Sequence, residues 1–241
     1  MGMAARNYLP QENAIWNTLY RRMEEPWERY ATRAFLEGQR KLGLRPDHVP
    51  QLEEVNQRLL PLTGFQAAEV PGYVPAKEFF GYLRRRSFPT VTSLRRADQL
   101  DYLPEPDIFH DVAGHVPMHT DPVFADTLAR FGALAEAFHD EQAVAEPLAR
   151  FFWFTIEFGL IEEGQGRKAY GSGLLSSFGE LEFALNSPKV ERRPFSLKEV
   201  LATPFEIDHY QGRLFVLESF AELYAAVAEL ERSLPLVSGR P

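Results

Sequence analysis

Cysteine is absent from all 241 residues of the sequence. Its absence excludes disulfide bonds and every metal site built on thiolate ligands, and it fits a protein of the reducing cytoplasm. No apolar run approaches the roughly 20 residues of a membrane-spanning helix. The N-terminus also lacks the basic segment and apolar run of a signal peptide. We therefore expect a cytoplasmic protein without a membrane partner.

Excess positive charge is absent too. The chain has 26 Lys and Arg against 34 Asp and Glu, which gives a formal net charge of −8. Such a balance does not favour binding to nucleic acid. The composition is 45% hydrophobic and 25% charged, as in ordinary globular proteins, and the length suits one sizeable domain. We expect a single domain over residues 1–241, with no nucleic-acid partner.

Two histidines five residues apart, His110 and His115, stand in the stretch PEPDIFHDVAGHVPM (residues 104–118). Prolines and acids just ahead of them predict a helix start near residue 106. On a regular α-helix, positions five apart sit about 140° apart and do not share a face. Gly114 and Pro117 predict that the helix ends near Gly114, which turns His115 towards His110. Alone, the pair is equally compatible with ordinary polar residues at a helix end.

A carboxylate, Glu157, stands in the middle of a segment that is apolar nearly all round (residues 150–160). Such a segment is buried, and a buried carboxylate needs a partner. The partner is either an arginine or a metal shared with His110 and His115. Two imidazoles and one carboxylate form the ligand set of non-haem Fe(II) oxygenases, but zinc accepts the same ligands.

Three sequence blocks carry a family resemblance: PEPDIFHDVAGHVPM from Pro104, FWFTIEFGL from Phe152 and KAYGSGLLSSFGEL from Lys168. In this order and spacing they resemble the catalytic domain of the pterin-dependent aromatic amino acid hydroxylases, most of all the bacterial phenylalanine 4-monooxygenase branch. The resemblance runs from about residue 71 to about residue 220. It implies the catalytic-domain fold of that family, mainly α with a few short strands.

The resemblance implies an Fe(II)- and tetrahydropterin-dependent monooxygenase that hydroxylates L-phenylalanine to L-tyrosine with O2. The pterin is tetrahydrobiopterin or a bacterial analogue, and His110, His115 and Glu157 bind the iron. Hydroxylation of tryptophan or tyrosine within the same family stays open. A third hypothesis is a non-catalytic amino-acid or pterin binding protein with a structural zinc. Structural zinc sites normally have a fourth protein ligand, and none is evident near these blocks.

The resemblance also places the substrate contacts. Arg95 stands fifteen residues before His110, where the family's arginine holds the substrate carboxylate; a guanidinium suits this because it forms two parallel hydrogen bonds. The alternative for Arg95 is a surface salt bridge. Ser176 is expected to support His110 at its other ring nitrogen, with helix capping as the alternative. The remaining expected substrate contacts are Trp153, Phe158, Gly173, Ser176 and Ser177.

The expected pterin contacts are Gly72, Val74, Ala76, Phe79, Asp111 and Phe152. Stacking on a flat bicyclic ring suits Phe79, and core packing suits it equally well. Asp111 follows the first histidine where animal members of the family have a longer Glu, so its pterin contact is expected to run through water.

Spacing, prolines and capping serines predict the elements. Helices are expected at residues 13–23, 26–42, 50–63, 75–83, 122–149, 177–186, just after 196 and at 219–234. Strands are expected at 66–70, at 91–94 and once or twice within 205–217. His119 is expected to be a loop residue and not a ligand. The chain shows neither the regulatory domain nor the long tetramerisation helix of animal members, so a monomer is expected.

Overall fold

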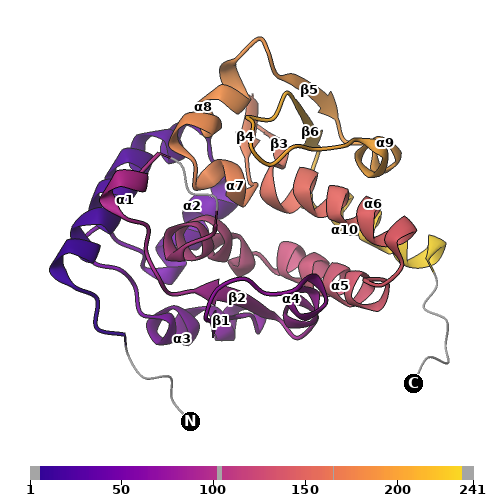
Figure 1. Cartoon of the computed structure of the whole chain (residues 1–241). Coiled ribbons are helices and arrows are strands. Elements are labelled where there is room, and N and C mark those ends of the chain that lie inside the picture. Colours follow the sequence, from indigo (N-terminus) through magenta and orange to yellow (C-terminus); the bar gives the residue numbers. More distant parts are fainter. Residues whose placement is uncertain (1–5, 102–104, 165, 235–241) are drawn as a thin grey trace.

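The structure, a computed structural model, describes residues 6–101, 105–164 and 166–234 (Figure 1). Pro104, the first residue of the histidine motif, lies outside these residues. The described chain is mainly helical, as predicted, and contains six short strands. The α-helices are α1 (Pro10–Tyr30), α2 (Arg33–Leu42), α3 (Leu52–Thr63), α4 (Ala76–Arg84), α5 (Pro122–Ala137), α6 (Gln142–Phe152), α7 (Ser172–Leu175), α8 (Phe178–Asn186), α9 (Leu197–Ala202) and α10 (Phe220–Ser233). The strands are β1 (Gln66–Val70), β2 (Ser87–Val91), β3 (Leu160–Glu163), β4 (Gly166–Ala169), β5 (Glu191–Pro194) and β6 (Arg213–Leu217).

Four further helical segments complete the fold. Two are 3₁₀-helices, η1 (Ala97–Gln99) and η3 (Val116–Thr120), and two are π-helices, η2 (Phe109–His115) and η4 (Trp153–Glu157). Helices α1 to α3 form one side of the molecule, and α5, α6 and α10 lie on the other (Figure 1). One cluster of buried hydrophobic side chains extends from Trp16 to Leu230 and joins the two sides. The histidine motif lies between the two sides, and η3, which follows it, packs against α2 and α5.

The predicted break at Pro26 is wrong, because α1 continues through it to Tyr30. The break falls at Thr32, whose N–H donates to the Ala169 carbonyl oxygen at 2.9 Å. The Glu163 carboxylate accepts from the Thr32 hydroxyl at 2.8 Å and from the next backbone N–H at 2.9 Å. Contacts from β3 and β4, 130 or more residues away in sequence, therefore set the end of the first helix, and Pro26 does not end it.

The strands form two small sheets. β1 and β2 pair in parallel, with Gln66 opposite Ser87, and α4 connects them. The other sheet has the order β4-β3-β6-β5. The prediction for residues 66–70 is confirmed, but the strand expected at 91–94 lies at 87–91, and only β6 forms within 205–217. β3, β4 and β5 were not predicted, since their charged sequences lack the apolar alternation of a strand.

Three helix starts follow the predicted capping pattern. Ser177, Ser196 and Ser219 each accept a hydrogen bond from the backbone N–H three residues on.

The long helix expected at 122–149 is two helices, α5 and α6, separated at residues 138–141. The part of the chain that the structure describes has no helix with the length and apolar character needed to cross a bilayer.

His119 is not a loop residue, so that prediction is wrong. It lies in η3 with 0% of its surface exposed, packed near the rings of Phe65, Phe88 and Phe124. Burial lowers the pKa of His119 well below its usual value, so the ring is neutral.

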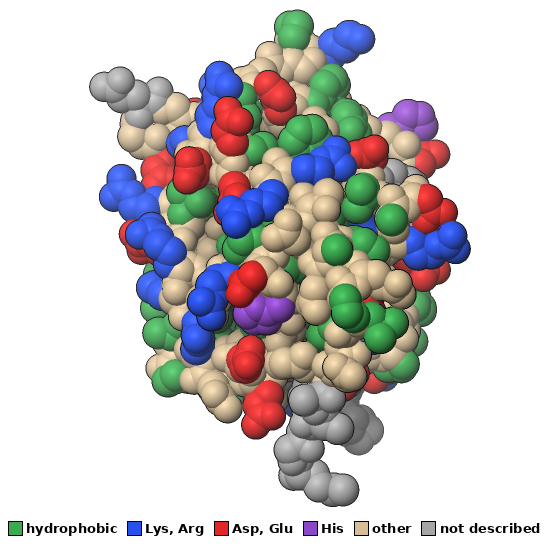
Figure 2. Space-filling view, turned by 90° about the vertical axis from the view of Figure 1, so that its left-hand side faces the viewer, with side chains coloured by type: hydrophobic (Ala, Val, Ile, Leu, Met, Phe, Trp, Pro, Cys, Tyr) green, Lys and Arg blue, Asp and Glu red, His purple; other side chains and the backbone are tan. Residues whose placement is uncertain are grey.

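On the surface of the molecule, basic and acidic side chains are interspersed over the face shown in Figure 2.

Candidate active site

The two histidines are aligned by the π-helix η2. Its hydrogen bonds reach from i to i+5, as in the bond from the Val116 N–H to the Asp111 carbonyl oxygen. This turn is wider than an α-helical turn, so residues five apart come to lie nearly on one face. The helix does not end at Gly114 as predicted; the wider turn brings His115 towards His110. Gly114 lets α7 approach, because a Cβ there would lie 3.2 Å from the Ser172 carbonyl oxygen.

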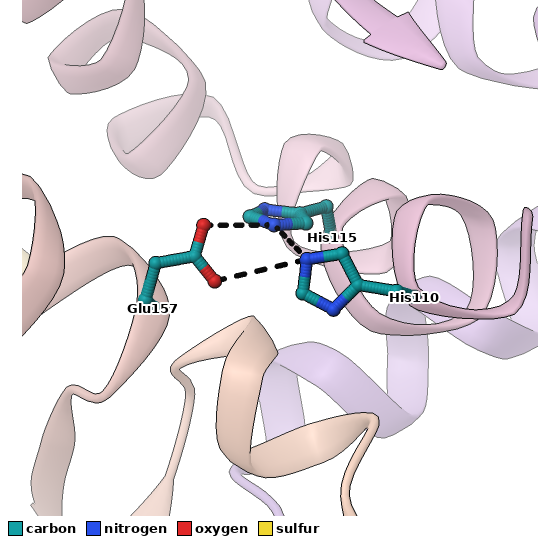
Figure 3. Close-up of side chains that lie close together, drawn as sticks. All are labelled: His110, His115 and Glu157. Atoms are coloured by element: carbon teal, nitrogen blue, oxygen red, sulfur yellow. Dashed lines mark hydrogen bonds and ion pairs between the residues drawn. The ribbon is translucent and has the colours of Figure 1, made fainter. Parts of the chain in front are cut away.

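A second π-helix, η4, presents the carboxylate. The Phe158 N–H donates to the Trp153 carbonyl oxygen at 2.9 Å, again from i to i+5. Glu157 thereby points at both imidazoles (Figure 3). Its Oε1 lies 3.1 Å from Nε2 of His115, and its Oε2 lies 3.8 Å from Nε2 of His110. The two Nε2 atoms are 3.2 Å apart, so the three residues offer converging ligand atoms, all within 4.8 Å of one another.

The hydroxyl of Ser176 fixes the tautomer of His110. It donates to the Ser172 carbonyl oxygen at 2.8 Å, and it lies 2.8 Å from Nδ1 of His110. Since its proton is already used, the hydroxyl accepts from Nδ1–H, and the lone pair of Nε2 faces Glu157 and His115. Burial and the neighbouring His115 lower the pKa of His110 to about 4. The ring is therefore neutral and ready to act as a metal ligand, which fits a divalent metal such as Fe(II).

His115 is held differently. Its ring packs against Phe88, with centroids 4.5 Å apart, and among the described residues its buried Nδ1 has no hydrogen-bond partner. Burial raises the pKa of Glu157, but the two histidines and the N–H of Gly173 together outweigh burial, so the carboxyl pKa lies below its usual value. The site thus contains an ionised carboxylate, one ring oriented by a hydrogen bond and one oriented by packing.

Asp107 connects Arg95 to the histidine helix. Its carboxylate accepts from Nε and Nη2 of Arg95 at 2.8 and 2.9 Å, and from the backbone N–H of His110 at 3.0 Å. The Arg95 side chain is only 7% exposed, so the surface salt bridge considered for it does not occur. One edge of the guanidinium is occupied by Asp107. Among the described residues, the other edge, Nη1 and Nη2, makes one long contact, from Nη1 to the Leu100 carbonyl oxygen at 3.5 Å.

An aromatic wall lies beside Glu157. The rings of Trp153 and Phe158 pack with centroids 4.6 Å apart. Gly173 supports this wall from behind, since a Cβ there would lie 2.9 Å from the Phe158 ring and 3.0 Å from the Glu157 carbonyl oxygen. Ser177 is the N-cap of α8, where its hydroxyl accepts the Glu180 N–H. Of the expected substrate residues, Ser176 contacts His110, Gly173 lies against Glu157 and Phe158, and Ser177 is engaged in capping.

A cavity of about 490 Å³ is lined in part by His110, His115 and Glu157. Of the expected pterin residues, those that line it are Gly72, Val74, Phe79 and Asp111. Phe152 does not line it but packs edge-on against Phe79 at 5.6 Å, and Ala76 begins α4. One oxygen of Asp111 accepts the Val91 N–H at 2.7 Å, and burial raises the pKa of Asp111 well above its usual value.

Two other features lie away from this site. Glu206, Asp208 and His209 form a second group of potential ligand atoms, but all three are exposed. A larger groove of about 700 Å³ lies between α1, β3 and β4, and contains none of the expected site residues. Sequence reasoning missed the pairing of Asp107 with Arg95. Asp107 stands three residues before His110, the spacing of a helix N-cap residue, and this spacing could have indicated that Asp107 has a structural role.

A mainly helical chain that presents two imidazoles and one carboxylate to one point has the ligand set of a mononuclear non-haem iron oxygenase. Residues 2–235 match the family model for biopterin-dependent aromatic amino acid hydroxylases, and the chain belongs to this family.

Relatives and solved structures agree with this. A phenylalanine-4-hydroxylase of Mesorhizobium japonicum is 43% identical over 220 residues, covering 90% of this chain and 78% of its own. The crystal structure of Chromobacterium violaceum phenylalanine hydroxylase with bound oxidised Fe(III) matches with a TM-score of 0.90 at 38% identity, covering 98% of this chain and 86% of that one. The phenylalanine hydroxylase of Legionella pneumophila matches with a TM-score of 0.89 at 38% identity, covering 96% and 94%.

Proposed function

We propose that this chain is an Fe(II)- and tetrahydropterin-dependent monooxygenase that converts L-phenylalanine and O2 to L-tyrosine. The observation that carries the proposal is the convergence of His110, His115 and Glu157, whose ligand atoms lie within 4.8 Å of one another. The names of the relatives support phenylalanine over tryptophan or tyrosine. The pterin is tetrahydrobiopterin or a bacterial analogue.

In this proposal His110, His115 and Glu157 hold the iron. Bound Fe(II) and tetrahydropterin together supply the activation of O2 for hydroxylation of the aromatic ring. The protein orients the ligands and the substrate. Ser176 keeps Nε2 of His110 unprotonated, because its hydroxyl oxygen accepts a hydrogen bond from Nδ1–H. The ionised Glu157 offsets part of the metal's charge inside the protein.

The substrate side of the site is formed by Arg95 and the aromatic wall. The free edge of the Arg95 guanidinium binds the phenylalanine carboxylate through Nη1 and Nη2, while Asp107 holds the opposite edge. Trp153 and Phe158 border the substrate ring, and Gly173 leaves room for their packing. Ser177 contributes by fixing the start of α8 beside Ser176.

The pterin occupies the 490 Å³ cavity. Phe79 offers its ring for stacking, and the loop with Gly72 and Val74 forms the opposite border. Asp111, with one oxygen already accepting the Val91 N–H, reaches the pterin through water. Phe152 and Ala76 act indirectly, by buttressing Phe79 and by starting its helix.

The test is reconstitution with Fe(II) under anaerobic conditions, followed by aerobic turnover with tetrahydropterin and each of the three aromatic amino acids. The proposal predicts tyrosine from phenylalanine as the preferred reaction. Preferred hydroxylation of tryptophan or tyrosine would reassign the substrate. Absence of any product in an iron-loaded, folded protein would favour a binding role instead.

We also propose that the chain acts as a monomer in the cytoplasm and binds only small molecules. Multi-angle light scattering at micromolar concentration tests the first part, and a tetramer would contradict it.

A further inference from the structure

The loop between α9 and β6, residues 203–212, forms the outer side of the aromatic wall. Phe205 of this loop stacks on Trp153, with centroids 4.4 Å and planes 14° apart, and Trp153 in turn packs on Phe158. Between the loop and Phe154 lies a cavity of about 190 Å³. Stacking of Phe205 thus holds one part of the loop, and polar contacts hold another.

One side chain makes these polar contacts. The amide nitrogen of Gln211 donates to the carbonyl oxygens of Glu206 and His209, both at 2.9 Å. Its Oε1 accepts from the indole N–H of Trp153 at 3.1 Å. Carbonyl oxygens only accept and an indole N–H only donates, so the orientation of the amide is unambiguous. Gln211, which is 7% exposed, thus ties the loop to the ring of Trp153.

The backbone of Gln211 is anchored as well. Its N–H donates to Oε1 of Glu180 at 2.9 Å. Glu180 lies in the first turn of α8, three residues after Ser177, and is 8% exposed. Ser177 and Glu180 have the spacing of a capping box, but the Glu180 carboxylate accepts from the Gln211 N–H instead. A continuous set of hydrogen bonds therefore extends from the start of α8 through Gln211 to Trp153.

We propose that Gln211 is a positioning residue, which sets the angle of the Trp153 ring and thereby the fit of the substrate's aromatic ring beside Glu157. The inference rests on the proposed function, in which Trp153 borders that ring. Gln211 acts through the indole and touches neither the iron nor the substrate. Without its amide, the indole loses its acceptor and the loop loses two bonds. The substrate ring is then held less well, and pterin is oxidised without matching tyrosine formation.

The first test needs no activity. The three tryptophans of the chain each donate an indole hydrogen bond: Trp16 to the Arg45 carbonyl, Trp27 to the Leu175 carbonyl and Trp153 to Gln211. Solvent exchange of the three indole protons is measured by NMR, with the Trp153→Phe variant assigning its signal. In Gln211→Leu the exchange of the Trp153 proton should rise about tenfold while the other two stay unchanged. Unchanged exchange at Trp153 would overturn the proposal.

The second test measures tyrosine formed per pterin oxidised by the iron-loaded enzyme. Gln211→Leu should lower this ratio by roughly fivefold, which is about the change in an equilibrium constant when one neutral hydrogen bond is lost. In a Trp153→Phe background the same substitution should add little, because the indole N–H is already gone. Fully additive effects of the two substitutions would show that Gln211 does not act through Trp153, and would overturn the proposal.

Two further variants serve as a control and as a replacement for a variant that does not fold. His209→Gln is the matched control, since its exposed side chain is replaced while its backbone carbonyl still accepts from Gln211; it should behave like the parent. If Gln211→Leu does not fold, Gln211→Asn carries the same predictions, because the shorter amide cannot reach both carbonyls and the indole. A parent enzyme that forms no tyrosine would contradict the proposed function, while the exchange measurement would still decide the role of Gln211.

Discussion

Arg95 and Asp107 form a buried double ion pair, with Nε–Oδ2 and Nη2–Oδ1 distances of 2.8 and 2.9 Å. The same carboxylate accepts the backbone N–H of His110. The residue expected to hold the substrate is therefore fixed by the residue that starts the histidine helix. A substitution at Arg95 is therefore expected to act on both substrate binding and stability.

Arg95→Ala should lower phenylalanine affinity by roughly ten- to a hundredfold, because a charge-assisted contact in a partly dry site is lost. It should also lower the free energy of unfolding by about 3–5 kcal/mol, because Asp107 is left buried and unpaired. Lysine should not restore either property, since an ammonium cannot bind two carboxylates at two planar edges. Calorimetric titration and denaturant unfolding measure the two effects.

The control is Arg96→Ala. Arg96 pairs with Asp98 on the surface, with 78% and 65% of the side chains exposed, so its loss should change stability and affinity very little. Equal behaviour of the Arg95 and Arg96 variants would remove Arg95 from the substrate site.

Acid should weaken the same pair. Burial raises the pKa of Asp107, but the hydrogen bonds and charge of Arg95 outweigh burial and hold the carboxyl pKa below its usual value. A group with a lowered folded pKa adds stability above its unfolded pKa of about 3.8, and this stability is lost as pH falls through the folded value. In Asp107→Asn this part of the acid dependence should be absent. An unchanged acid profile of the variant, relative to the parent, would contradict the assignment.

Ser176→Ala and Ser177→Ala separate two roles of neighbouring serines. Loss of the Ser176 hydroxyl frees Nδ1 of His110 and should weaken Fe(II) binding by roughly 10- to 100-fold. Loss of the Ser177 hydroxyl removes the N-cap of α8 and should cost about 1 kcal/mol of stability with iron affinity unchanged. Competition with a metal chelator and thermal unfolding measure the two effects. A reversed pattern, with iron affinity lowered only in Ser177→Ala, would refute the tautomer argument.

Glu180 should make stability depend on pH near neutrality. Burial raises its pKa to about 7 from 4.5. The unfolded chain releases this proton near 4.5 and the folded chain near 7, so the folded state binds more protons in between and stability falls as pH rises through this window. The loss approaches about 3 kcal/mol, at about 1.4 kcal/mol per unit of pKa difference. The facing Tyr210, with a pKa raised above 10.0, titrates outside the window.

The matched variant is Glu180→Gln, which keeps an acceptor for the Gln211 N–H and carries no charge. Its free energy of unfolding relative to the parent should rise between pH 5 and pH 8, as followed by urea denaturation. A constant difference between the two proteins across this range would show that Glu180 is ionised throughout.

The sequence allowed prediction that His110, His115 and Glu157 lie together, and of the helix caps at Ser177, Ser196 and Ser219, because motifs and capping residues are recognised from residue types at fixed spacing. It did not allow prediction of the two π-helices, since the wider turn follows from packing around the site. The run of α1 through Pro26 was missed for a similar reason: contacts from Glu163 and Ala169 set its end.

Long-range hydrogen bonds account for the other omissions. The 31-residue separation between Glu180 and Gln211, and the 58-residue separation between Gln211 and Trp153, leave no local pattern to read. The burial of His119 could not be predicted either, because the phenylalanines around it come from three separate parts of the chain.

The most direct measurement is the iron stoichiometry of the parent chain and of His115→Ala, determined by anaerobic equilibrium dialysis against Fe(II) and paired with a turnover assay for tyrosine. We expect one Fe(II) per parent chain and tyrosine formation from phenylalanine. Folded His115→Ala should lose both, because the two remaining ligands hold the metal too weakly. A folded His115→Ala protein that still binds one iron and forms tyrosine at the parent rate would contradict the account.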